Sequence, residues 1–188
     1  DALTHAMEAI VSVQHGPVSD ALALEAIRLI HQNLLTAVED GNNIEARAAM
    51  LTAANLAGMA FNHSMVGVVH AVAHSIGALC HVHHGTANAI FLPYGLAYNQ
   101  EEAQTEMIKI APSLGLSSDA STQDIINIVH DLLKKINASC GMPICLKDSG
   151  VKEDQLEKIA ELAEEDGASF YNPRPVSKED ILPFIKQA

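Results

Sequence analysis

Five of the ten histidines lie within fifteen residues of one another: His70, His74, His81, His83 and His84. His70 and His74 are four residues apart, so a helix would place both side chains on one face. Their neighbours are Val and Ala, and a buried imidazole without a polar partner costs free energy. A lone buried histidine is usually a satisfied core residue. This pair, followed by three more histidines, favours a metal or catalytic site.

An acid and an imidazole at the start of the sequence have the same spacing. Asp1 and His5 are four residues apart, so both could reach one ion from a helix. Taken alone the pair is weak evidence, because such pairs are also common on helix surfaces. His84 precedes Gly85 at an expected helix start, where a short turn would hold it.

Together these residues form a ligand set with a recognisable chemistry. Imidazole suits zinc, copper, iron and nickel, and a carboxylate shifts the preference toward iron or zinc. Three histidines and one aspartate would leave a coordination position open for water or substrate. An open position is typical of catalytic sites, whereas structural sites are closed.

The other histidines and the cysteines give weaker signals. His81 and His83 are expected in a loop, where one could face the site or both could be solvated. The four histidines without a partner in sequence are interpreted as structural or surface residues: His15, His31, His63 and His130. Cys80, Cys140 and Cys145 are odd in number and form no CxxC pair. They are interpreted as ordinary thiols of a reducing compartment.

Composition limits the classes of protein that the sequence can encode. Hydrophobic residues make up 48% of the 188 residues, aromatics only 4%, and Trp is absent. A core of Ala, Leu and Ile favours helices, and such a composition excludes wholesale disorder. The net charge of −12 argues against nucleic acid and anionic membranes as partners. Neither a signal peptide nor a stretch of about 20 apolar residues is visible, so we expect a cytoplasmic protein.

Helical periodicity runs through the whole chain, and no alternating β pattern occurs. We expect an all-α fold of eight to ten helices. Neither GxGxxG nor GxxxxGK[ST] occurs, so the sequence has no nucleotide fingerprint of its own. The expected helices cover residues 1–14, 20–38, 44–62, 66–79, a segment opening at 85, 101–114, 122–139, 152–166 and a short last helix.

Several residues predict where these helices begin, bend or end. Ser19 is the expected N-cap of the second helix. Pro93 would kink or break the fifth. Residues 172–175 read Asn-Pro-Arg-Pro and should be extended, because a residue that precedes Pro disfavours helix. Ser177 with Asp180 forms a loose capping box that starts the last helix.

Four segments, in order, resemble the motifs of the iron-containing (group III) alcohol dehydrogenases. The first nine residues resemble that family's D-A-x-x-H-A-x-E segment. Residues 70–78 and 84–89 resemble its H-x-x-x-H-x-x-G and later H-G-x-x-N-A signatures. Asn172-Pro173-Arg174 resembles its C-terminal N-P-R. The resemblance extends over essentially all 188 residues.

The resemblance implies a fold and a domain organisation. Residues 1–188 would form the all-helical, metal-binding and catalytic C-terminal domain of the dehydroquinate synthase-like fold. An N-terminal α/β domain outside this chain would bind NAD or NADP. The first residue is Asp1 and not Met, which fits a processed chain or one piece of a longer protein. A homo-oligomer is also expected from the resemblance.

The resemblance also assigns roles to the histidine set. The family's four metal ligands fall on Asp1, His5, His70 and His84, which would hold Fe²⁺, with Zn²⁺ as the other candidate ion. His74 matches a histidine that is not usually a ligand, and is a candidate catalytic proton relay. The implied reaction is reversible hydride transfer between a small primary alcohol or aldehyde and NAD(P). Without the nucleotide-binding half, the isolated chain should be inactive.

Alternatives remain open at this point. Zinc-dependent glycerol dehydrogenase-like enzymes share the fold family but use fewer metal ligands. A helical metal-dependent hydrolase would need more carboxylates or an adjacent His-Asp pair. A non-enzymatic helical metal-binding module is the alternative outside enzymes. The loop at residues 80–83 also departs from relatives, which often carry aromatic residues and Pro there; His81 or His83 could compete for the metal.

Overall fold

Nine α-helices, four short 3₁₀-helices and no strand make up the computed structural model, which describes all residues 1–188. In chain order the α-helices are α1 (Ala2–Val11), α2 (Pro17–Glu39), α3 (Ile44–Ser64), α4 (Val68–Cys80), α5 (His84–Asn99), α6 (Gln104–Ile108), α7 (Thr122–Cys140), α8 (Leu156–Glu165) and α9 (Lys178–Ile185). The 3₁₀-helices are η1 (Ala111–Leu114), η2 (Lys147–Ser149), η3 (Glu153–Gln155) and η4 (Gly167–Tyr171). The structure confirms the expected all-α class.

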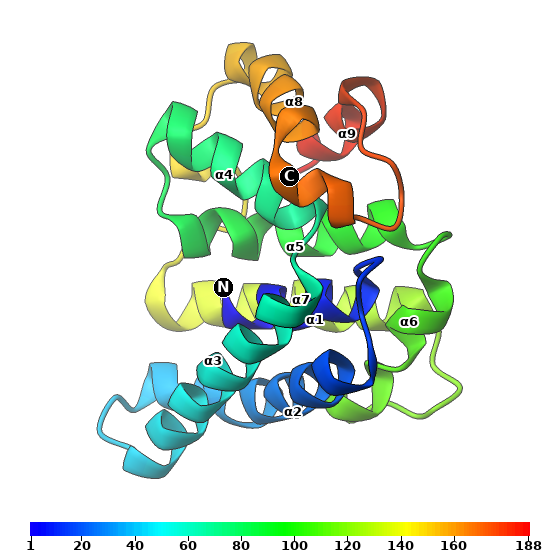
Figure 1. Ribbon diagram of the computed structural model, residues 1–188. Helices are drawn as coiled ribbons and strands as arrows, with labels where there is room; N and C mark the ends of the chain where they lie inside the picture. Colours follow the sequence, from blue (N-terminus) through cyan, green and yellow to red (C-terminus); the bar gives the residue numbers. More distant parts are fainter.

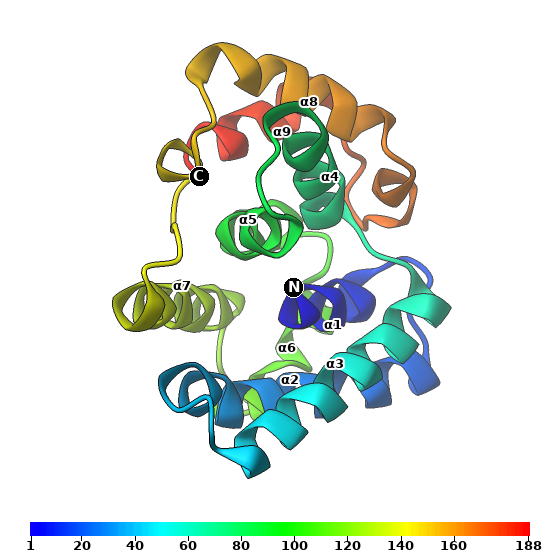
Figure 2. The same ribbon diagram turned by 90° about the vertical axis from the view of Figure 1, so that its left-hand side faces the viewer.

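Helix α1 lies where two groups of helices meet (Figure 1). The helices α2 and α3 pack together and against α1 on one side. On the other side, α4 packs against α5 and α8, and α9 packs against α8 and α5. Helix α7 runs beside α5 and also contacts α2. The first turn of α1 therefore lies between the α2–α3 pair and the group formed by α4, α5, α8 and α9. Figure 2 shows this end of the chain at the front.

Small and aliphatic side chains fill the interior, as the composition predicts. One cluster of 39 buried hydrophobic residues draws on every α-helix of the fold. Close helix approach depends on glycine at one crossing. A Cβ atom at Gly95 of α5 would overlap the Cγ2 of Val69 on α4. This crossing brings the first turn of α4 near α5, which matters for the site described below.

Most predicted helix boundaries agree with the structure, but two predictions are wrong. Ser19 is not the N-cap of α2; Gly16 is, and the Ser19 hydroxyl accepts a hydrogen bond from the Gly16 N–H. Pro17 supplies the fixed φ that starts this helix one turn earlier. The single helix expected over 101–114 is divided into α6 and η1. Pro112 has no N–H to donate, which ends the regular α-helical ladder there.

The later boundaries follow the sequence more closely. Pro93 lies inside α5, which continues through it. Residues 172–175 are non-helical, as expected. The Ser177 hydroxyl accepts a hydrogen bond from the Asp180 N–H at the start of α9, which confirms that cap.

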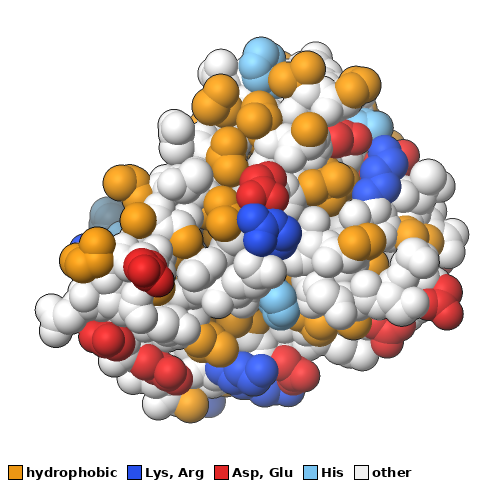
Figure 3. Space-filling model, turned by 90° about the horizontal axis from the view of Figure 1, so that it is seen from below, with side chains coloured by type: hydrophobic (Ala, Val, Ile, Leu, Met, Phe, Trp, Pro, Cys, Tyr) orange, Lys and Arg blue, Asp and Glu red, His pale blue; other side chains and the backbone are white.

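Acidic and basic side chains alternate with hydrophobic ones on the face below α2 and α3 (Figure 3). The exposed large hydrophobic residues of α3 include Ile44, Leu51 and Met59. No single helix is both long and apolar enough to cross a membrane. The helices α3 and α4 reach that length and hydropathy only together, with a bend of 105° between them.

Candidate metal centre

Three helices bring the four predicted ligands together. Asp1 and His5 come from the start of α1, His70 from the first turn of α4, and His84 from the first residue of α5. The Nε2 atoms of His5 and His70 are 3.1 Å apart. Asp1 Oδ1 lies 3.9 Å from His70 Nε2 and 3.3 Å from His84 Nε2. The helical i, i+4 spacing and the crossing of α4 with α5 therefore produce one cluster.

These separations fit a bound transition-metal ion. Bonds from a metal to imidazole nitrogen or carboxylate oxygen are about 2.0–2.2 Å long, so two ligands of one ion lie at most roughly 4.4 Å apart. One ligand atom each from Asp1, His5 and His70 lies within 4.8 Å of the other two, and His84 lies outside this group of three. His84 approaches Asp1 from the remaining side. The donor set of three imidazoles and one carboxylate suits iron or zinc.

The cluster has one buried side and one open side. The side chain of His70 is 2% exposed, whereas those of Asp1 and His84 are 44% and 43% exposed. A small molecule can therefore approach from the face that carries Asp1 and His84, seen around the N-terminus in Figure 2. On the inner side, the ring of Phe61 lies 4.5 Å from that of His5, measured between centroids.

Burial lowers the pKa of two of the candidate ligands, His5 and His84. Desolvation, followed by the neighbouring His70, lowers the pKa of His5 to about 3. Desolvation, followed by His70 and His74, also lowers the pKa of His84. Only a neutral imidazole has a free lone pair for a metal. At neutral pH these two rings are thus ready to act as ligands.

The sequence did not reveal the residue that orients His70. Glu8 is 1% exposed, and its carboxylate lies 2.6 Å from His70 Nδ1. It also accepts hydrogen bonds from the backbone N–H groups of Val69 (2.6 Å) and His70 (3.3 Å). A carboxylate that accepts the Nδ1–H of an imidazole fixes its tautomer and leaves Nε2 free to bind a metal. Glu8 also places negative charge at the N-terminus of α4, where the helix dipole favours it.

A second residue completes the cap of α4. The Asn172 side-chain oxygen accepts hydrogen bonds from the Val68 N–H (3.1 Å) and from the Asn99 amide (2.9 Å). Gly67 precedes α4 at this point. A Cβ atom there would lie 2.7 Å from Asn172 Oδ1 and 3.1 Å from Glu8 Oε1. Only glycine at position 67 leaves room for the side chains of Asn172 and Glu8, which both cap α4. The Asn-Pro-Arg segment therefore supports the helix that carries His70 and does not contact the candidate ligands.

Asn88 links two of the predicted ligands. Its side-chain Nδ2 donates to Asp1 Oδ1 at 3.0 Å and lies 3.0 Å from His84 Nε2. Asn88 is on α5, one turn after His84, and is fully buried. Its Oδ1 has no hydrogen-bond partner in the structure. Its sequence signal was the N of the H-G-x-x-N-A motif, four residues after His84.

His74 lies beside the cluster and outside the compact ligand group. Its ring stacks on that of His84, with 5.5 Å between centroids and 13° between planes. The ring of His70 is 5.9 Å away in an edge-on arrangement. His74 Nδ1 lies 3.0 Å from Asp166 Oδ2. The side chain is 45% exposed, so it faces the open side of the centre.

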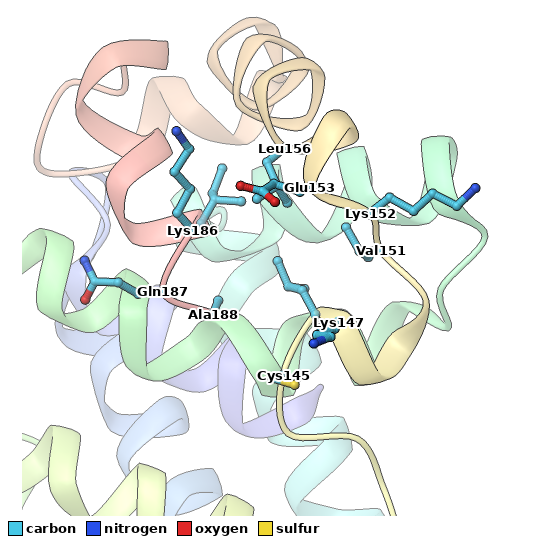
Figure 4. A pocket seen from close by; sticks show the side chains of 11 residues that line it. Cys145, Lys147, Val151, Lys152, Glu153, Leu156, Lys186, Gln187 and Ala188 are labelled. Atoms are coloured by element: carbon cyan, nitrogen blue, oxygen red, sulfur yellow. The ribbon is translucent and has the colours of Figure 1, made fainter.

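The remaining predicted features lie at the edge of the site or away from it. His81 ends α4 in the left-handed conformation, with φ of 57°. The ring of His83 approaches Gly85 within about 3.5 Å of where a Cβ would stand. A cavity of about 560 Å³ lies near Cys145 and Ala188. Figure 4 shows the side chains that line it, among which Lys152 extends away from the other labelled ones. None of the predicted ligands lines that cavity.

Comparison with known proteins identifies relatives of this chain over its whole length. The profile described as "Fe-containing alcohol dehydrogenase family, C-terminal" matches residues 1–188. The "1,3-propanediol dehydrogenase" of Citrobacter freundii is 43% identical over 189 residues, which cover 100% of this chain and 49% of that protein. The "NADPH-dependent butanol dehydrogenase" of Clostridium saccharobutylicum is 36% identical, with 96% of this chain and 47% of that protein covered.

A solved structure shows the same fold. The "Alcohol dehydrogenase from Oenococcus oeni" matches with a TM-score of 0.93 and 38% identity, and the match covers 100% of this chain and 49% of that one. The chain therefore spans about half the length of the proteins it matches.

Proposed function

The chain belongs to the Fe-containing alcohol dehydrogenase family, and on that premise we propose that it is the metal-binding catalytic half of an iron-dependent alcohol dehydrogenase. The intact enzyme would transfer a hydride reversibly between a small primary alcohol or aldehyde and NAD or NADP. The convergence of Asp1, His5, His70 and His84 at one open cluster carries this proposal. Relatives named for alcohols support the substrate class.

In this proposal the four clustered residues would hold Fe²⁺, which when bound would supply Lewis-acid polarisation of the substrate oxygen. The protein's own contribution is to set the ligands in place. Glu8 orients His70 through Nδ1, and Asn88 orients Asp1. The exposed side of the cluster admits the alcohol, and the buried side excludes water from His70.

His74 would handle the proton of the reaction. The alcohol O–H must lose a proton as its carbon gives up a hydride to the nicotinamide ring. His74 stands beside His84 at the open side of the centre and has a 45% exposed side chain. It can therefore accept that proton and pass it to solvent, as a general base does.

The cofactor and partners belong to the same proposal. The chain spans about half of each relative, so the nicotinamide cofactor would be bound mainly by an α/β domain that these 188 residues do not include. A homo-oligomer and a cytoplasmic location stay predictions. The choice between NAD and NADP also depends on residues outside this chain.

A metal-content experiment on the intact protein tests the proposal. The wild type, a His70→Ala/His84→Ala variant and a His63→Ala/His130→Ala control are loaded anaerobically with Fe²⁺ or Zn²⁺, and bound metal and NAD(P)-coupled alcohol oxidation are measured. The wild type and control should bind one ion per chain and be active with iron. The His70/His84 variant should lose both properties.

Three outcomes would overturn this assignment. Full metal content in the His70→Ala/His84→Ala variant would show that the ion binds elsewhere. Activity with zinc and none with iron would favour the glycerol dehydrogenase-like alternative. Metal binding without any alcohol oxidation by the intact protein would favour a non-enzymatic metal-binding module.

His74→Ala should keep the metal and slow turnover by about 10²–10⁴-fold, the usual contribution of general acid–base catalysis.

A further inference from the structure

A carboxylate far away in sequence holds the ring of His74. Asp166 Oδ2 lies 3.0 Å from His74 Nδ1, although the two residues are 92 positions apart. The side chain of Asp166 is 22% exposed, about half as much as that of His74. No protein group hydrogen-bonds the Nε2 atom of His74. The imidazole thus has one nitrogen engaged by a carboxylate and one nitrogen free.

The position of Asp166 is fixed by its own surroundings. Its backbone lies at the corner between α8 and η4. Its second oxygen, Oδ1, accepts a hydrogen bond from the Ala168 N–H at 2.8 Å and caps η4. The Ser169 hydroxyl ties the same corner to the Ala163 carbonyl at 2.6 Å. Both oxygens of the carboxylate are therefore used, and Oδ2 has one orientation, toward α4.

We propose that Asp166 is the positioning residue of the His74 proton relay: it accepts the Nδ1–H of His74, fixes the ring against His84, and leaves Nε2 as the base for the substrate proton. This inference rests on the proposed function. A carboxylate behind an imidazole sets the tautomer and stabilises the cation that forms on proton transfer. The candidate ligand histidines of the cluster could not serve this role, because each would use a ring nitrogen to hold the metal.

The proton step balances with the reactants of the proposed reaction. The O–H bond of the alcohol breaks and an N–H bond forms at His74 Nε2. The oxidised nicotinamide cofactor, when bound, would supply the acceptor for the hydride of the alcohol carbon. Asp166 keeps its charge throughout and pairs with the imidazolium. Because His74 is half exposed, the proton then leaves from Nε2 to water.

Replacing Asp166 with Asn separates positioning from structure. The Asp166→Asn variant keeps a side-chain oxygen that can cap η4, since Asn is as good a capping residue as Asp. Its NH₂ group, however, would face His74 Nδ1 as a donor. The ring must then accept at Nδ1 and carry its hydrogen on Nε2, which is the wrong tautomer for a base. The matched control is Glu164→Gln, because Glu164 lies at the same corner but accepts from the Lys178 N–H.

Three measurements on the intact protein test the proposal. Nitrogen-15 NMR of the zinc-loaded protein should show His74 as the Nδ1–H tautomer in the wild type and in Glu164→Gln, and as Nε2–H in Asp166→Asn. Metal content should be the same in all three. With iron bound, kcat in Asp166→Asn should fall by about 10²–10⁴-fold with little change in KM, and Asp166→Glu should recover part of it.

A double variant completes the test. If Asp166 acts through His74, adding Asp166→Asn to His74→Ala should lower kcat no further. An equal fall in both backgrounds, or an unchanged His74 tautomer in Asp166→Asn, would overturn the proposal. The tautomer measurement needs no turnover, so it distinguishes failure of this inference from failure of the proposed dehydrogenase activity.

Discussion

Replacing Glu8 with Gln should weaken both the fold and the metal centre, because one carboxylate serves both. Glu8 is 1% exposed and faces three donors: the Val69 N–H, the His70 N–H and the His70 Nδ1–H. Gln has the same shape but only one acceptor oxygen. Its other terminal atom is a nitrogen that donates, so at least one buried donor loses its partner.

The size of the effect follows from these hydrogen bonds. A hydrogen bond to a charged group contributes about 1.5–3 kcal/mol, a neutral one about 0.5–1.5 kcal/mol, and an unpaired buried donor costs about 1–3 kcal/mol. When one of the three bonds is broken and the other two become neutral, the free energy of unfolding should fall by roughly 3–6 kcal/mol. Loss of the group that orients a metal-bound histidine typically lowers metal affinity about 10–100-fold.

Urea denaturation of the metal-free protein and competition with a chromophoric chelator measure the two effects separately. Asp20→Asn is the matched control, because Asp20 pairs with His15 at 3.1 Å in a part of the fold without predicted ligands. It should alter stability but leave metal affinity unchanged. A folded Glu8→Gln protein that binds Fe²⁺ or Zn²⁺ as tightly as the wild type would refute the role given to Glu8.

Three further predictions concern the same junction. Because burial lowers the pKa of His5 from its ordinary value of 6.5 to about 3, the unfolded chain binds the extra proton first as the pH falls; the metal-free protein should lose about 2 kcal/mol of stability between pH 7 and pH 5. Denaturation at both pH values should show a smaller loss in His5→Asn, and an equal loss would contradict the prediction. Gly67→Ala should push Asn172 and Glu8 off the start of α4 and lower the unfolding midpoint and metal affinity together; a change in stability alone would count against coupling of the cap to the site. Asn88→Ala should lower metal affinity about 10-fold, since it frees Asp1 from its amide; chelator competition checks this, and unchanged affinity would make Asn88 only a packing residue.

The candidate ligands Asp1, His5 and His70 stood out in the sequence because their helical spacing is local, whereas His84 was assigned by the family resemblance. A helix places residues i and i+4 on one face whatever surrounds it, so Asp1 with His5 and His70 with His74 were visible as pairs. The same rule could not tell which member of the second pair belongs to the metal. The structure places His70 in the compact group with Asp1 and His5 and His74 beside it. That difference follows from the crossing of helices, which no local pattern records.

The roles of the supporting residues could not be assigned, although Glu8 and Asn172 belong to the quoted motifs, because their partners are distant in sequence. Glu8 contacts a residue 62 positions away, Asn172 one that is 104 away, and Asp166 one that is 92 away. An Asp or Glu on a helix can be a cap, an ion-pair partner or a surface residue, and the adjacent residues in the sequence do not show which of these roles it has. The start of α2 was missed for a local reason at Ser19, where Pro17 and Gly16 begin the helix earlier than the hydroxyl suggested.

The last quarter of the chain contributes no predicted metal ligand, yet its residues contact the two helices, α4 and α5, that carry His70 and His84. Asn172 caps α4 at the turn that carries His70, and Asp166 fixes His74 on the same helix one turn after His70. Arg174 lies 4.2 Å over the ring of Tyr98 on α5, the helix that carries His84. The helices α4 and α5, which carry the candidate ligands His70 and His84, therefore both contact the segment between α8 and α9. We therefore expect changes in the packing of this segment to alter the geometry of the candidate metal centre, because a shift of either helix would break contacts to the segment.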